Sequence, residues 1–307
     1  MNSPKVTIAV PILNEAKFIR QALDSLNEQT YPNIEVRIVD GGSTDGTLEI
    51  LRTYDFPFES IPRLGQMASI NKVWIETTSE YVTWMAGDDV LYPNAIKDLV
   101  IALDSCPDAS FAHGPADVID GDGKLLFRRT ACDITTDDLL RSYCMLPQTG
   151  LIRRKSLLDS GPTNPSLRFA ADHDLYLRLS FFGFGVAAKS TIAKFRIHEG
   201  SEDAKNFSEV GRQTVRVVEE VIQSDLGKRY LAPNQIKLGR AHSRIVCGNF
   251  VISNSNRLEA FECLVCAIKM KPFIIFDLKC IKLVIRLLSP LVVSPNLLRK
   301  SMHFFRR

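Results

Sequence analysis

The beginning of the chain lacks the apolar segment that directs a protein to secretion. Residues 1–5 lead straight into the run Val6–Val10, whereas a signal peptide needs an apolar stretch of about 7–15 residues and a cleavage site of small residues. Seven cysteines, an odd number, are scattered over 307 residues, which favours reduced thiols over a disulfide framework. We therefore expect a cytoplasmic protein.

Three further absences exclude other classes of protein. Cys263 and Cys266 have no second cysteine or histidine pair at zinc-finger spacing, so we expect small residues on a buried helix face. Pro11–Glu15 follows the first apolar run in place of Gly-x-Gly-x-x-Gly, which argues against a dinucleotide-dependent oxidoreductase. The formal net charge of +3 is too small to indicate a nucleic-acid partner.

Short apolar runs alternate with amphipathic segments over the first hundred residues. The apolar runs predict strands at Val6–Val10, Ile34–Val39, Phe58–Ile61 and Tyr81–Met85. The amphipathic segments predict helices at Ala16–Asn27, Thr47–Tyr54, Ala68–Thr77 and Asn94–Asp104. This alternation predicts an α/β fold with a mostly parallel sheet covered on both faces. In such sheets a ligand binds outside the carboxyl ends of the strands.

The pattern changes after residue 115. A hairpin is expected around Asp120–Gly123, followed by a few short helices and strands. From about Ser208 the sequence is typical of helices throughout, with breaks near Gly227–Pro233 and at Pro272. We therefore expect a catalytic domain over residues 1–205 and a helical C-terminal region over residues 206–307.

The first acidic cluster, 39–46, directly follows the second predicted strand. Its glycines permit a tight turn, and Ser43, Thr44 or Asp45 can cap the next helix. Asp40, at the strand end, can accept hydrogen bonds from a base or a ribose. A structural loop with a capping residue would have the same composition.

The second cluster is the adjacent pair Asp88 and Asp89, which follows another apolar strand. Two neighbouring carboxylates repel each other unless a cation offsets their charge. Carboxylates completed by substrate phosphates commonly hold Mg²⁺ or Mn²⁺. A solvated turn leading into a helix is the alternative.

The third cluster contains Asp172, His173 and Asp174 at the start of an amphipathic segment. Either carboxylate can accept hydrogen bonds from the free N–H groups of a helix N-terminus. Considered alone, this cluster predicts a helix cap.

Taken in order, these segments resemble family-2 glycosyltransferases of the GT-A fold. The matching stretches are 10–15, 39–47, Gly65-Gln66 with Ala68, Asn71 and Lys72, 87–89, 172–174, and 195–198. The resemblance covers roughly residues 5–205. It implies a Rossmann-like domain that binds a nucleotide diphosphate sugar.

The resemblance also implies a role for each matching residue. The nucleotide-sugar site would include Pro11, Asn14, Glu15, Asp40, Gly65, Gln66, Asn71 and Asp88, with Asp40 at the base and Asp88 near the ribose. Asp89 and His198 would hold Mn²⁺ or Mg²⁺ at the diphosphate. Asp172 would be the general base that deprotonates the acceptor hydroxyl.

Two departures from the family pattern affect these roles. The metal motif reads Gly87-Asp88-Asp89 without an earlier Asp, so the choice of metal ligand is an inference. Ala171 precedes Asp172 where many members carry an acidic residue, which leaves Asp174 as a substitute base. Gln148, before a strand expected at Thr149–Ile152, is a further candidate on the acceptor side.

A single base with no enzyme nucleophile predicts inversion at the anomeric carbon. The expected acceptor is a sugar, a lipid-linked compound or another hydroxyl, in the synthesis of surface polysaccharide or a related glycoconjugate. A catalytically silent relative that only binds nucleotide sugars is the alternative.

The apolar stretch 272–293 is long enough to raise the question of a membrane span. Its four charges, Asp277, Lys279, Lys282 and Arg286, argue against one, because each costs about 2.5–3.5 kcal/mol near the bilayer centre. On a helix the three cations form one stripe. Residues 272–307 would then contact an anionic membrane surface, on the inner face of the membrane. Alternatively, they would form a helix that packs on the catalytic domain and exposes the cations to water.

Overall fold

The computed structural model describes residues 3–142, 150–198, 206–254 and 256–288. The chain divides into two compact units, and each is described by itself. Within the described residues, the α/β unit comprises residues 3–134, 150–166 and 182–198. The helical unit comprises residues 135–142, 167–181 and 206–288. The predicted boundary at residue 205 lies outside the residues that the structure describes, and so does Gln148.

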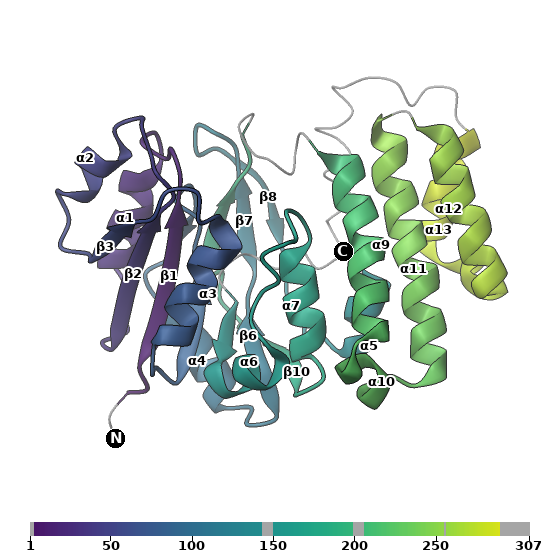
Figure 1. The fold of residues 1–307 in the computed structure, drawn as a ribbon, viewed down its shortest axis with the longest axis horizontal. Helices are drawn as coiled ribbons and strands as arrows, with labels where there is room; N and C mark the ends of the chain where they lie inside the picture. The colour runs from purple at the N-terminus through teal and green to yellow at the C-terminus, as the bar shows by residue number, and fades with distance from the viewer. Residues whose placement is uncertain (1–2, 143–149, 199–205, 255, 289–307) are drawn as a thin grey trace. The chain divides into compact units, whose positions relative to one another are not determined.

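The α/β unit is built on a seven-stranded sheet in the order β10-β6-β9-β4-β1-β2-β3 (Figure 1). All neighbours are parallel except β9, which is antiparallel to both β4 and β6. The strands are β1 (Val6–Ile12), β2 (Ile34–Asp40), β3 (Phe58–Ser60), β4 (Tyr81–Trp84), β6 (Ala109–His113), β9 (Leu151–Arg153) and β10 (Phe184–Ala187). The predicted mostly parallel α/β sheet is confirmed.

The helices of this unit follow the strands in the predicted alternation. They are α1 (Ile19–Asn27), α2 (Thr47–Leu51), α3 (Gln66–Glu76), α4 (Ala95–Asp104) and α6 (Arg154–Ser160). Side chains alternate across a strand, so Val6, Ile8 and Val10 of β1 share one core with apolar residues of α1 and α4. Thr7 faces the other side, where its hydroxyl lies 2.7 Å from those of Thr77 and Ser79, just after α3.

A second sheet of four strands extends the unit in the order β5-β11-β7-β8. Its strands are β5 (Val90–Leu91), β7 (Ala116–Ile119), β8 (Leu125–Arg129) and β11 (Ala193–Arg196). The hairpin of β7 and β8 is antiparallel, as predicted, and Asp120 Oδ1 accepts hydrogen bonds from the backbone of Asp122 and Lys124 in its turn. β11 brings residues 193–196 beside β5, directly after Asp88 and Asp89.

The helical unit confirms the predicted helices beyond residue 206 for the residues that the structure describes, which end at residue 288. Its elements are α5 (Thr136–Arg141), α7 (Ala171–Leu179), α9 (Phe207–Gln223), α10 (Asp225–Tyr230), α11 (Pro233–Val251), η1 (Ile252–Asn254), α12 (Arg257–Met270), η2 (Pro272–Phe276) and α13 (Leu278–Leu288) (Figure 1). Cys263 is buried and Cys266 half-buried on α12. Within the described part of the chain, no helix is both long and apolar enough to cross a bilayer.

The orientation of α13 corrects one expectation from the sequence. We expected Lys279, Lys282 and Arg286 to be exposed to water if the helix packs on protein, but all three are half-buried. Arg286 donates hydrogen bonds to Asn249 O and Ser253 Oγ, and Lys279 donates to Arg141 O and Ser142 Oγ. Lys279 and Arg286 therefore face the rest of the helical unit, where carbonyl and hydroxyl oxygens accept their hydrogen bonds.

Candidate active site

The loops after β1 and β2 are tied together by hydrogen bonds. The backbone N–H groups of Asn14 and Glu15 donate to Ser43 Oγ and Thr47 Oγ1 at 2.8 and 2.9 Å, and the N–H of Thr44 donates to Asn14 Oδ1 at 2.9 Å. Asn14 adopts a positive φ of 58°, which brings its backbone and side chain to the same partner loop. These hydrogen bonds fix the two loops to each other at the carboxyl ends of neighbouring strands, along one edge of the sheet.

Asp40 stabilises the loop after β2 by accepting hydrogen bonds from it. Its side chain is fully buried and accepts hydrogen bonds from the N–H groups of Gly42 and Ser43 and from Ser60 Oγ, the last at 2.6 Å. Burial would raise the pKa of Asp40, but the hydrogen bonds from Ser43 and Ser60 outweigh it and lower the pKa. Asp40 is therefore a charged residue that orders the loop, and its contact with a base stays a prediction.

Glu15, Asp88 and Asp89 place three carboxyl groups in one region of the α/β unit. Burial, followed by the charges of Asp88 and Asp45, raises the pKa of Glu15 to about 8. Gly87 lets the chain pass close to Glu15, because a Cβ on Gly87 would lie 2.9 Å from Glu15 Cγ. Burial and the repulsion between these carboxyl groups thus favour the protonated form of Glu15.

Asp88 and His198 face each other across the region. Asp88 Oδ2 and His198 Nε2 are 3.2 Å apart, and their side chains are 19% and 23% exposed. The His198 ring also packs on Phe18, with ring centroids 4.9 Å apart. A carboxylate oxygen and an imidazole nitrogen, both potential metal ligands and both partly exposed to solvent, thus lie side by side. Within the described residues, no set of three His, Cys, Asp or Glu side chains is arranged to hold a metal ion by itself.

Asp89 is placed differently from Asp88. It is 3% exposed, and its Oδ1 accepts a hydrogen bond of 3.0 Å from the backbone N–H of Arg196. Burial, and then the charge of Asp88, raises the pKa of Asp89 well above its usual range. Asp89 therefore joins the turn after β4 to the end of β11, and its predicted role as a metal ligand is not tested by these contacts.

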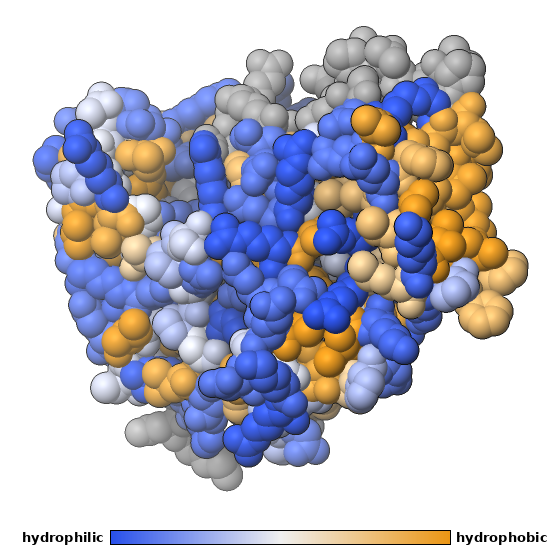
Figure 2. All heavy atoms as spheres, turned by 45° about the vertical axis from the view of Figure 1, so that its right-hand side comes forward, coloured by the Kyte–Doolittle hydropathy of each residue, from blue (hydrophilic) through white to orange (hydrophobic). Residues whose placement is uncertain are grey.

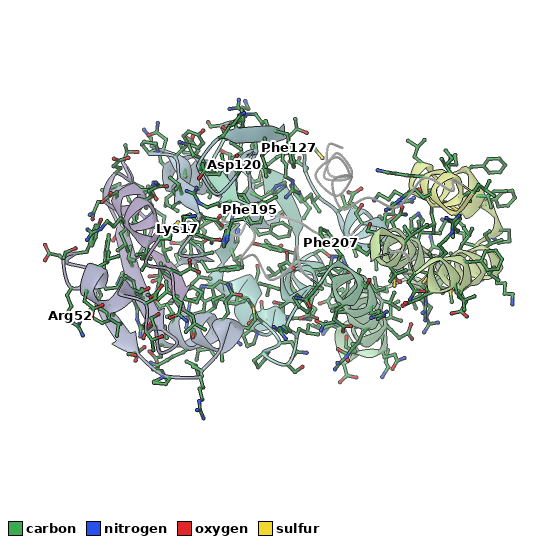
Figure 3. The ribbon with its side chains drawn as sticks, turned by 90° about the horizontal axis from the view of Figure 1, so that it is seen from above. Lys17, Arg52, Asp120, Phe127, Phe195 and Phe207 are labelled. Carbon is green, nitrogen blue, oxygen red and sulfur yellow. The ribbon has the colours of Figure 1, made fainter. Side chains whose placement is uncertain are left out.

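Arg196 is a central residue to which we assigned no role from the sequence. It is buried, its Nε donates to Asp88 O at 2.9 Å, and its other guanidinium nitrogens bond Gln21 Oε1 and Asp120 O. The guanidinium carbon lies 4.7 Å from the centroid of the Phe18 ring. Figure 3 views this edge from above, with Lys17, Asp120 and Phe195 labelled around it. The only indication of Arg196 in the sequence is its position within the motif 195–198.

The other predicted donor residues occupy less central positions. Pro11 is a buried residue of β1, and Gly65 and Gln66 are exposed at the start of α3, where Gly65 has a positive φ of 82°. The Asn71 amide is buried and bonds to Thr163, accepting from its N–H and donating to its carbonyl oxygen. A donor contact by Asn71 would require this amide to exchange partners, and it stays a prediction.

Asp172 belongs to the helical unit, in the first turn of α7. It is half-exposed, and its Oδ1 accepts a hydrogen bond of 2.8 Å from the N–H of His173. Asp174 is buried and forms an ion pair with Arg178, with 2.6 Å between Oδ2 and the guanidinium nitrogen. The two candidate bases thus differ in how accessible they are to a molecule from solvent.

Comparisons with known proteins agree with this fold and these motifs. Residues 7–174 match the profile described as Glycosyl transferase family 2. An "Uncharacterized glycosyltransferase" of Rickettsia bellii is 28% identical over 67% of this chain and 32% of its own length. Chondroitin synthase of Escherichia coli is 29% identical over 59% of this chain and 27% of its own. The chain thus spans about a third of the length of these relatives.

Solved structures show the same fold. S. aureus TarS 1-349, crystallised in complex with UDP-GlcNAc, superimposes with a TM-score of 0.65 at 17% identity, covering 98% of this chain and 92% of that chain. The mannosyltransferase PcManGT of Pyrobaculum calidifontis, in complex with GDP-Man and Mn²⁺, gives a TM-score of 0.59 at 18% identity, covering 99% and 84%. The fold is therefore that of the GT-A glycosyltransferases. The chain belongs to glycosyl transferase family 2.

Proposed function

We propose that this protein transfers a sugar from a nucleotide diphosphate sugar to an acceptor hydroxyl, with inversion at the anomeric carbon. The observation that carries the proposal is the Asp88–His198 pair at the carboxyl edge of the α/β unit, 3.2 Å apart and partly exposed. The structures of TarS in complex with UDP-GlcNAc and of PcManGT in complex with GDP-Man and Mn²⁺ support a donor of this class.

The donor set fits a divalent transition ion. The Asp88 carboxylate oxygen and the His198 imidazole nitrogen lie 3.2 Å apart, so both could bind one ion, and the diphosphate oxygens of the donor would complete the coordination. The imidazole favours Mn²⁺ over Mg²⁺, which prefers ligands that are all oxygen. The bound ion would act as a Lewis acid on the leaving diphosphate.

This geometry favours exchanging two of the roles expected from the sequence. Asp88 and His198 would hold the ion, whereas Asp89, buried and bonded to the backbone of Arg196, would hold the turn in place. Arg196 would fix the carbonyl of Asp88 through its Nε, and thereby the direction of the Asp88 side chain. Glu15, with its raised pKa, would lie beside the ion as a proton reservoir.

Asp172 is the better candidate for the general base. A base must be accessible to the attacking hydroxyl whose proton it accepts, and Asp172 is half-exposed whereas Asp174 is buried in its ion pair with Arg178. Deprotonation by Asp172 would direct the hydroxyl to the anomeric carbon opposite the leaving diphosphate. One displacement of this kind inverts the configuration.

The similarity to chondroitin synthase supports a role in the synthesis of a polysaccharide or another glycoconjugate. The acceptor would be a sugar, a lipid-linked compound or another hydroxyl. The membrane contact expected from the sequence is likewise a proposal.

A panel of nucleotide sugars tests the proposed function. The full chain is incubated with each donor and Mn²⁺, and both binding and slow donor hydrolysis are measured. Asp88→Asn and His198→Gln should weaken Mn²⁺-dependent donor binding, while Asp104→Asn, on α4, serves as a control for the loss of one charge. Metal-dependent binding without turnover for every donor and acceptor would instead indicate a silent nucleotide-sugar-binding relative. Full transfer activity in both site variants would refute the proposal.

A further inference from the structure

The outward face of α13 is apolar along its whole length. Leu278, Ile281, Ile285 and Leu288 recur at intervals of three and four residues, so they form one stripe, and Leu278 and Leu288 are each 78% exposed. The opposite face, with Cys280 and Leu283, is buried against the rest of the helical unit. The helix therefore buries one apolar face and presents a second one to its surroundings.

The stripe continues into η2, the short helix that precedes α13. Phe273 and Phe276 are 79% and 73% exposed, with Ile275 beside them. Figure 2 shows hydrophobic residues gathered over α12, η2 and α13. A contiguous apolar surface of this kind on a folded protein marks a site of interaction rather than scattered exposed residues. We call the six residues Phe273, Phe276, Leu278, Ile281, Ile285 and Leu288 the apolar stripe.

Charge indicates which partner covers the stripe. Residues 257–307 contain ten Lys or Arg and only three Asp or Glu, whereas residues 1–256 contain 28 and 32. Lys269 is exposed and Lys271 half-exposed, directly before the apolar stripe. Two copies of the chain meeting through the stripe would bring like charges together, which is unfavourable. An anionic lipid surface attracts the same cations.

We propose that the apolar stripe inserts into the interface of an anionic membrane, with Lys269 and Lys271 at the level of the lipid headgroups. In this arrangement α13 lies parallel to the membrane plane, as amphipathic helices with Phe and Leu on their inner face do. Arg286 and Lys279 stabilise the helix from the protein side, because their hydrogen bonds to Asn249 and Arg141 fix which face points outward. The apolar side chains, and not the cationic stripe of α13, then make the membrane contact.

Vesicle sedimentation of the full chain tests the proposal, with phosphatidylcholine alone and with about one third phosphatidylglycerol. Burial of an exposed Phe contributes roughly tenfold in affinity, so Phe273→Ser with Phe276→Ser should lower partitioning about 100-fold. Lys269→Gln with Lys271→Gln should lower it roughly 25-fold, and only on the anionic vesicles. Ile101→Ser with Leu158→Ser, which removes two apolar residues of the α/β unit that are each 53% exposed, should change nothing.

Three results would overturn the proposal. The first is that the full chain does not sediment with anionic vesicles. The second is that the Phe273→Ser, Phe276→Ser variant partitions as the unmodified chain does. The third is that the unmodified chain forms a dimer and binds no vesicles, whereas this variant is a monomer. Far-ultraviolet circular dichroism confirms that the variants are folded. Donor hydrolysis by the Phe273→Ser, Phe276→Ser variant in solution should equal that of the unmodified chain. Loss of membrane binding and failure of the proposed glycosyl transfer are therefore distinguished by separate measurements.

Discussion

Asp89 Oδ1 and the backbone N–H of Arg196 are joined by a hydrogen bond of 3.0 Å between residues 107 positions apart. Both side chains are buried, and the Arg196 side chain donates a second hydrogen bond to the same turn, at Asp88 O. The turn that carries the two aspartates is therefore held by the end of β11. His198, two residues beyond Arg196, is positioned opposite Asp88 by the same connection.

Asp89→Ala should destabilise the protein by roughly 1–3 kcal/mol, because it leaves the buried backbone N–H of Arg196 without its acceptor. Asp89→Asn keeps an oxygen acceptor at the same place and should cost less than half as much. Urea denaturation of both variants measures the difference. Equal destabilisation by the two substitutions would show that the hydrogen bond to Arg196 contributes little.

Binding of Mn²⁺ near Asp88 should release protons at pH 7. Glu15 has a pKa of about 8 and is mostly protonated there, and a nearby divalent cation favours its charged form. We expect up to about one proton released per ion at pH 7 and stronger binding as pH rises from about 6 to 8. Calorimetry in buffers of different ionisation enthalpy counts the protons. Glu15→Gln should abolish most of the release, and an unchanged count would contradict this assignment.

Asp172→Asn should lower transfer by about 10²–10⁴-fold and leave donor binding intact, because only the attack of the hydroxyl needs the base. Asp174→Asn should instead lower the melting temperature, since it leaves Arg178 without its buried partner. Measuring donor affinity, transfer rate and melting temperature for both variants separates the two roles. If Asp174→Asn abolished transfer without loss of stability, the roles would be reversed.

Two buried histidines should contribute to destabilisation of the fold by acid. Burial lowers the pKa of His113 and of His173 to about 4, against about 6.5 in an unfolded chain. At these two positions the unfolded state therefore binds protons below pH 6.5 that the folded state does not. Each histidine should lower the free energy of unfolding by roughly 2 kcal/mol between pH 6.5 and 5, while Glu15, whose pKa is raised to about 8 in the folded protein, contributes in the opposite direction. Chemical denaturation across this window, with His113→Gln as comparison, should show a shallower slope for the variant.

The sequence was sufficient to predict the strands and helices up to residue 104 except the two-residue strand β5, because their apolar periodicities are regular. It did not indicate β6, where Ala109–His113 lacks the branched residues typical of a buried strand. It also gave Arg196 no role, since Gln21 and Asp120 bond to it from 175 and 76 positions away. For α13, both faces show helical spacing, so only packing against α11 determines which one is exposed.

The helix that carries Asp172 depends on the C-terminal helices for its support. Just before α7, Phe169 shares a core with Val210, Val246 and Phe250, and its backbone N–H donates to Gln213 Oε1 at 2.9 Å. Deleting everything after residue 205 would strip these partners away and leave an aromatic side chain and a backbone amide facing water. A shortened chain of this kind would retain the residues proposed for the donor but lose the packing that holds Asp172, the residue that we propose as the general base. The C-terminal helices should therefore be needed for transfer if Asp172 is the base.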